Sequence, residues 1–160
     1  MILAVLLGFM IMEFVAYASH RYIMHGPMWF LHRSHHRERV GKFEANDWFG
    51  VGFSFISIAL IWFGKNGNPY LIGFGLGMAA YGLAYLMMHD FLTHGRFGRV
   101  NMPKNSYLRR LVRAHRIHHS RDELDGTENF GFLWAPRVEK LRPEKLKSGT
   151  DSTIDSTNQI

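Results

Sequence analysis

The sequence contains no cysteine, and this absence narrows the kinds of metal site that the chain can form. Without thiolates there are no disulfide bonds, no iron–sulfur clusters, no thiolate-ligated haem and none of the common structural zinc sites. Histidine is the strong transition-metal ligand that remains, and the 160 residues include ten histidines. A metal site in this chain is therefore expected to use imidazole ligands.

Charged residues are nearly missing from three long apolar runs, at residues 1–19, 48–64 and 70–88. A helix of 19 residues covers about 28 Å, close to the thickness of the hydrocarbon core of a bilayer. The runs predict an all-α membrane protein with about three transmembrane helices and leave a fourth membrane-embedded or interfacial helix open. The length of the chain fits one domain, placed at residues 1–140, and the polar range 141–160 is expected to be a disordered tail.

The first run has two features that need interpretation. Ala16-Tyr17-Ala18 resembles the cleavage site of a signal peptide, but no Lys or Arg precedes the run, so a retained transmembrane helix is favoured. Glu13 lies inside the run, where a carboxylate is costly unless it is paired. It is either an intramembrane carboxylate that is paired or faces a site, or a protonated, hydrogen-bonded interior residue.

Two smaller features concern packing. Gly73-x-x-x-Gly77 in the third run is typical of close helix–helix contact in lipid, either within the chain or between subunits. Trp29 lies in a short apolar bridge between histidines and is interpreted as part of an interfacial aromatic belt rather than as a substrate contact.

The number of spans and the basic residues predict the topology. With three spans, the segments that follow the first and the third span lie on the same side. Basic residues gather at 21–42 and 96–121, whereas Lys65 is the only one in the turn between the second and third runs. By the positive-inside tendency, a histidine-rich cap is cytoplasmic and Met1 is outside. The basic helix expected at 101–120 lies on the anionic leaflet, and no nucleic-acid partner is expected.

All ten histidines lie in two copies of one pattern, HxxxxHG followed by HRxHH, at residues 20–36 and 89–119. In HRxHH the histidines are at i, i+3 and i+4, which a helix places on one face, so we expect them to converge on one point. The HxxxxH pair is about 140° apart on a regular helix. We therefore place this pair at a helix end, and the glycine that follows supports this placement.

The number of histidines predicts two metals. One metal takes about four to six ligands, so ten histidines fit two metals with four or five each, one or two of them in supporting roles. Iron, zinc, copper and nickel all suit imidazole ligands. A redox metal is favoured, because a site at the membrane surface suits oxygen chemistry on a lipid-dissolved substrate.

The order HxxxxH, HxxHH, HxxxxH, HxxHH resembles the fatty-acid hydroxylase superfamily of histidine-box membrane oxygenases. Within it, the short chain and three phrases, beginning at Tyr22, Phe43 and Gly131, resemble the bacterial β-carotene 3-hydroxylase family. The phrases are YIMHG, FExND and GFLxAP. The resemblance covers roughly residues 10–140, and Trp134 stands where a tyrosine is expected.

The resemblance implies a non-haem di-iron monooxygenase of the bacterial inner membrane. Such an enzyme uses O2, with electrons from a ferredoxin or another donor, to hydroxylate C3 of β-ionone rings, turning β-carotene into zeaxanthin through β-cryptoxanthin. Its partners are the carotenoid substrate, the electron donor and membrane lipid. Asp90, beside His89, is either a hydrogen-bond partner of a ligand or a solvated charge at a helix end. The implied metal ligands are His20, His25, His32, His35, His36, His89, His94, His115, His118 and His119.

Other functions remain to be tested. A hydroxylase of the same superfamily that acts on a sterol or a fatty acyl chain fits the same pattern, and so does a non-enzymatic membrane metal-binding protein. A membrane b-type cytochrome is disfavoured, because it would bury paired histidines in its spans. A haem spectrum and oxygen-dependent product formation separate these classes.

Overall fold

The computed structural model describes residues 1–37, 41–98, 100–120 and 129–135, and the regular secondary structure in these ranges is entirely helical. The predicted tail at 141–160 lies outside the described residues. The helices are α1 (Ile2–Ala18), which continues as the π-helix η1 (Ser19–Met24), α2 (Trp29–His32), α3 (Asp47–Gly64), α4 (Pro69–Tyr85), which continues as the π-helix η2 (Leu86–Thr93), and α5 (Ser106–His119).

Three helices are long and apolar enough to cross a membrane, at Ile2–Met24, Asp47–Gly64 and Pro69–Thr93. This confirms the predicted all-α architecture with three spans. The first and third helices are longer than the apolar runs, because each continues without a break into its HxxxxH pair. Many large apolar side chains on these helices are exposed, as expected where the surrounding medium is lipid.

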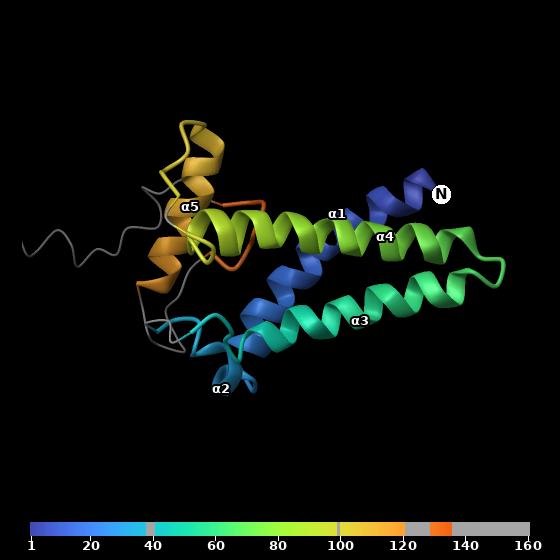
Figure 1. The fold of residues 1–160 in the computed structure, drawn as a ribbon, viewed down its shortest axis with the longest axis horizontal. Helices are drawn as coiled ribbons and strands as arrows, with labels where there is room; N and C mark the ends of the chain where they lie inside the picture. The colour runs from blue at the N-terminus through green and yellow to red at the C-terminus, as the bar shows by residue number, and fades with distance from the viewer. Residues whose placement is uncertain (38–40, 99, 121–128, 136–160) are drawn as a thin grey trace, which may run out of the picture.

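In Figure 1, α4 lies beside α3 over its length and also crosses α1, and residues of α4 are in contact with both helices. Glycines allow the α1–α4 crossing: a Cβ atom on Gly8 would lie 2.6 Å from the carbonyl oxygen of Phe74, and one on Gly77 would collide with that of Val5. The small residues of the third run therefore serve a contact within the chain. Between α3 and α4, the hydroxyl of Ser57 donates to the carbonyl oxygen of Gly75 at 2.8 Å.

Both HxxxxH pairs lie in π-helical segments, which the sequence analysis did not anticipate. The backbone N–H of His25 donates to the carbonyl oxygen of His20 at 3.0 Å. In the same way, the backbone N–H of His94 donates to the carbonyl oxygen of His89 at 3.0 Å. This i→i+5 bonding widens the turn and brings residues i and i+5 toward one side of the helix. The expected position at the helix end is correct. The glycine after each HxxxxH pair was expected to mark the end of a helix. This holds best for Gly95, whose φ of 61° lies in the left-handed region.

The helix expected at 101–120 begins only at Ser106. Its start is set by Asn105, whose side-chain oxygen accepts the backbone N–H groups of Tyr107 and Leu108. Its buried residues include Leu111 and Ala114, which pack with residues outside the helix rather than facing lipid. Figure 1 shows α5 at the same end of the bundle as α2, opposite to the α3–α4 turn. Both histidine-bearing segments thus share one end of the three spans.

Candidate metal centre

The ten histidines form two groups of five. Within each group, one ligand atom per residue lies within 4.8 Å of every other. Group one consists of His20, His25, His32, His36 and His118. Group two consists of His35, His89, His94, His115 and His119. The count matches the sequence expectation of two metals with about five histidines each.

The middle histidine of each HRxHH box belongs to a different group from the other two histidines of that box. His32 and His36 belong to group one, but His35 between them belongs to group two. In the second box His118 likewise joins group one, while its two partners stay in group two. The expectation that all three histidines of a box converge on one point is therefore wrong. Residues i+3 and i+4 differ by about 100° around a helix, so side chains at these positions can reach different centres.

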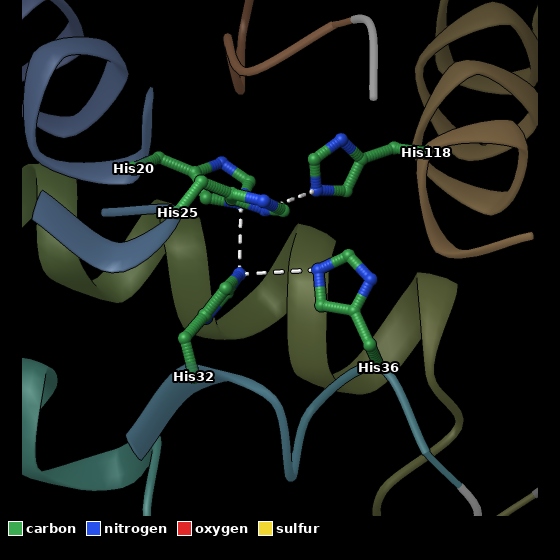
Figure 2. Close-up of side chains that lie close together, drawn as sticks. All are labelled: His20, His25, His32, His36 and His118. Atoms are coloured by element: carbon green, nitrogen blue, oxygen red, sulfur yellow. Dashed lines mark hydrogen bonds between the residues drawn. The ribbon is translucent and has the colours of Figure 1, made fainter. Parts of the chain in front are cut away.

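The nitrogen atoms inside each group have the spacing of ligands on one metal ion. In group one, the Nε2 atoms of His20 and His32 are 3.1 Å apart, and those of His32 and His36 are 3.2 Å apart. Metal–imidazole bonds are about 2.0–2.1 Å, so two such bonds at right angles separate their nitrogens by about 3 Å. Figure 2 shows the five rings of group one pointing toward a common centre from three segments of the chain.

Group two repeats this geometry. Its Nε2 atoms are 3.0 Å apart between His35 and His89, 3.1 Å between His94 and His115, and 2.8 Å between His115 and His119. The donor set of both groups thus fits transition-metal ions bound through Nε2.

Carboxylates contact two of the group-two rings at Nδ1, the nitrogen that faces away from the centre of the group. The Nδ1 atom of His35 lies 2.9 Å from Oε2 of Glu44, and that of His89 lies 2.7 Å from Oδ1 of Asp90. An acceptor at Nδ1 fixes the proton there and leaves the Nε2 lone pair free for a metal. Of the two interpretations of Asp90, the hydrogen-bonded one matches this contact. Glu44 was not among the site residues predicted from the sequence, although its place just before the second apolar run was a signal.

Arg96 connects these two carboxylate supports. Its guanidinium donates to Asp90 at 2.8 Å and to both oxygens of Asp47 at 2.6 and 2.7 Å. Oδ2 of Asp47 also accepts the backbone N–H of Glu44 at 3.0 Å. The supports of His35 and His89 are therefore parts of one ion-pair network that joins the start of α3 to the segment after η2.

Neutral oxygens hold two of the group-one rings. The Nδ1 atom of His32 lies 2.7 Å from the side-chain oxygen of Asn46, and that of His20 lies 3.2 Å from the carbonyl oxygen of Phe130. The contact of Phe130 is made by its backbone, so no side-chain pattern in the sequence could have revealed it. Both contacts leave Nε2 directed into the group.

Desolvation keeps four of the imidazoles outside the spans neutral. Burial lowers the pKa of His32 from its ordinary value to about 3. Burial, together with the neighbouring imidazoles, also places the pKa of His35, His115 and His119 well below the usual range. At neutral pH these rings carry no charge and keep the lone pair that a metal needs.

Aromatic rings and one cavity border the two groups. Trp29 packs against His25 and His36, with ring centroids 5.1 and 5.2 Å apart, so it borders group one, which its interpretation as a belt residue did not include. Tyr85 stacks on His89 of group two at 4.4 Å. A cavity of about 270 Å³ opens beside group two. It is lined by His35, His36, Arg37, Thr93, His94, His115, Arg116, His119 and Ser120.

Comparison with known proteins gives one family and several relatives. The fatty acid hydroxylase family profile matches residues 5–137. The chain is 47% identical over 131 residues to a beta-carotene hydroxylase of Pantoea ananas, covering 82% of this chain and 75% of that protein. It is 43% identical over 141 residues to the beta-carotene hydroxylase of Paracoccus sp. (strain PC1), covering 88% and 87%. A chloroplastic beta-carotene 3-hydroxylase 2 of Arabidopsis thaliana is 38% identical over 134 residues, 81% of this chain and 44% of that protein. No solved structure matches the chain.

Proposed function

Because the chain belongs to the fatty acid hydroxylase family, we propose that it hydroxylates the rings of carotenoids at a centre of two histidine-bound iron ions. The family match bears out the resemblance that the histidine spacing indicated. The similar proteins of bacteria and plants are named as beta-carotene hydroxylases, which favours a carotenoid over a sterol or a fatty acyl chain. The plant relatives named as 3-hydroxylases support C3 of the β-ionone ring as the position.

The observation that carries the metal part of the proposal is the pairing of two five-histidine groups with Nε2 atoms about 3 Å apart. The imidazoles of each group would hold one iron ion. When bound, the two irons supply the activation of dioxygen, one atom of which ends in the ring hydroxyl and the other in water. Two electrons per turnover come from a ferredoxin-type or reductase protein.

The protein's own part is to orient ligands and to exclude water. Asn46, Glu44 and Asp90 hold Nδ1 of three histidines, so each ring keeps one tautomer and one direction. The rings of Trp29 and Phe130 cover group one with apolar surface. Such cover suits chemistry on a hydrocarbon, because water near the reacting C–H bond would compete with it.

The position of the groups suits a substrate dissolved in lipid. His20 and His89 lie in the last turns of the first and third spanning helices, so the centre begins where the membrane-spanning helices end. A carotenoid is long and apolar, and one of its end rings can reach this level while the polyene stays in the bilayer. The basic residues at this end support the proposal that the centre lies at the cytoplasmic face of the inner membrane.

The test is coexpression of the chain in bacterial cells that accumulate β-carotene, with pigments separated by chromatography. The expected result is the appearance of mono- and dihydroxylated carotenoids. The matched control is His118→Ala, which removes one group-one imidazole and should give none. Membrane-inserted wild-type protein that yields only β-carotene in such cells would contradict the proposal.

A further inference from the structure

Glu13 is the one acidic residue within the first apolar run, and the metal centre described above does not use it directly. It lies near the middle of the helix Ile2–Met24, where a carboxylate is costly and therefore points to a specific role. Its Oε2 atom accepts the hydroxyl of Tyr81 from α4 at 2.7 Å. Its Oε1 atom faces a different part of the chain.

Oε1 accepts three consecutive backbone N–H groups of the 129–135 loop. The donors are Phe132 at 3.0 Å, Leu133 at 2.8 Å and Trp134 at 3.2 Å. All four bonds are donated to Glu13, which thus acts only as an acceptor. The turn is tight: a Cβ atom on Gly131 would lie 2.7 Å from the carbonyl oxygen of Trp134. A turn that presents successive N–H groups to one oxygen is a backbone anion-binding nest.

The same loop contacts group one at its other end. The carbonyl oxygen of Phe130 lies 3.2 Å from Nδ1 of His20, and the ring of Phe130 lies 5.4, 5.2 and 5.3 Å from those of His20, His25 and His118. Glu13 and His20 are seven residues apart, two helical turns, so they share one face of the helix at a separation of about 10 Å. One short loop can therefore bind both.

We propose that Glu13 is a positioning residue that holds the 129–135 loop against α1, so that the Phe130 carbonyl orients His20 and the Phe130 ring covers group one. The inference rests on the proposed metal centre. Without an acceptor at position 13, three backbone N–H groups lose their partner beside an apolar helix, which is costly. The turn should therefore shift, even though Phe132 and Leu133 still pack against the apolar cluster around Met12. The loss should reach group one, whose His20 the loop supports, and spare group two.

The experiment titrates the purified, metal-free full chain with Co2+ and follows binding and the ligand-field spectrum, which does not depend on turnover. Wild type is expected to bind two Co2+ ions. His118→Ala and His115→Ala identify the spectral signals of groups one and two, respectively. If wild type does not bind two ions, the metal-centre proposal fails, and the Glu13 proposal that rests on it fails with it.

Glu13→Leu should weaken Co2+ binding in group one by about 10–100-fold, the usual effect of losing the partner behind a ligand, and leave group two unchanged. Glu13→Gln keeps an amide oxygen for the three N–H groups and should be closer to wild type. Ser57→Ala is the matched control, because it removes another buried hydrogen bond between spanning helices and should leave both groups unchanged.

Gly131→Ala approaches the same contact from the loop, and it decides the case if Glu13→Leu does not insert into the membrane. The added Cβ would distort the turn that presents the N–H groups, so this variant should also weaken group one alone. The proposal is overturned if group one binds Co2+ with wild-type affinity and spectrum in the inserted variants. It is also overturned if both groups weaken equally, since Glu13 would then support only the fold.

Discussion

Asp90→Asn is the substitution that most cleanly separates ligand support from ligand loss. The change keeps the size of the side chain but removes the charge that lies 2.7 Å from Nδ1 of His89. The new amide can also present its NH2 group to Nδ1, which favours the wrong imidazole tautomer for binding through Nε2. It further weakens the bond from Arg96, which now meets a neutral group.

The size of the effect follows from what the contact does. His89 is 3% exposed and remains in group two, so the variant keeps five imidazoles and loses only the support of one. Loss of such a partner typically costs about 10–100-fold in metal affinity, or about 1.4–2.7 kcal/mol. In group one, Asn46 supports His32 and the Phe130 carbonyl supports His20, so this group should keep its affinity.

The assay is Co2+ titration of the metal-free protein, with the two signals assigned as above. Asp47→Asn is the graded control: it loses part of the pair with Arg96 but leaves the Asp90–His89 contact in place, so its effect should be smaller. If Asp90→Asn binds Co2+ in group two as tightly as wild type, the carboxylate does not support the ligand. An equal loss in both groups would refute the separation of the two groups.

Three further predictions follow from the same geometry. Alanine at the i or the i+3 histidine of either HRxHH box should abolish ring hydroxylation with normal membrane insertion, whereas Arg33→Ala and Arg116→Ala, at exposed positions between those histidines, should retain activity by pigment chromatography. Cysteines introduced at Lys42 and Lys104 should react with a membrane-impermeant thiol reagent only after cells are opened, while one at Asn66 should react in intact cells; equal labelling of all three from outside contradicts the topology. In metal-free protein, burial lowers the folded-state pKa of His32, His35, His115 and His119, so their contribution to stability is present above pH about 6.5. This contribution is lost as the pH falls below that value, by up to about 1.4 kcal/mol per histidine per pH unit. The melting temperature in detergent should therefore drop between pH 7.5 and 5.

The spans and the candidate ligands could be predicted because both depend on local sequence. The length of an apolar run can be counted directly, and ten histidines in a repeated pattern indicate a candidate metal centre before any fold is known. The sequence did not predict that His35 joins group two and His118 joins group one, each apart from the rest of its own box. This assignment depends on how α5 faces the segment after α2. The HxxxxH pairs were interpreted on the geometry of a regular α-helix, because residue spacing alone does not predict a π-helix.

The supports behind the ligands show the same limit. Asp90 was found because it adjoins His89 in the chain, whereas Glu44 lies nine residues from His35, and Phe130 lies 110 residues from His20. For Glu13, the cost of a carboxylate in a spanning helix signalled a special role. The identity of its partners required the placement of the 129–135 loop, which no local pattern contains.

The central claim is that ring hydroxylation needs both histidine groups filled, and iron loading tests it most directly. Metal-free protein is reconstituted with zero to two equivalents of Fe2+ per chain, supplied with a reductant, O2 and β-carotene, and assayed for hydroxylated product against iron content measured by elemental analysis. Iron should saturate near two ions per chain, and turnover should depend on the second equivalent. Full turnover by protein that holds a single iron per chain would contradict it.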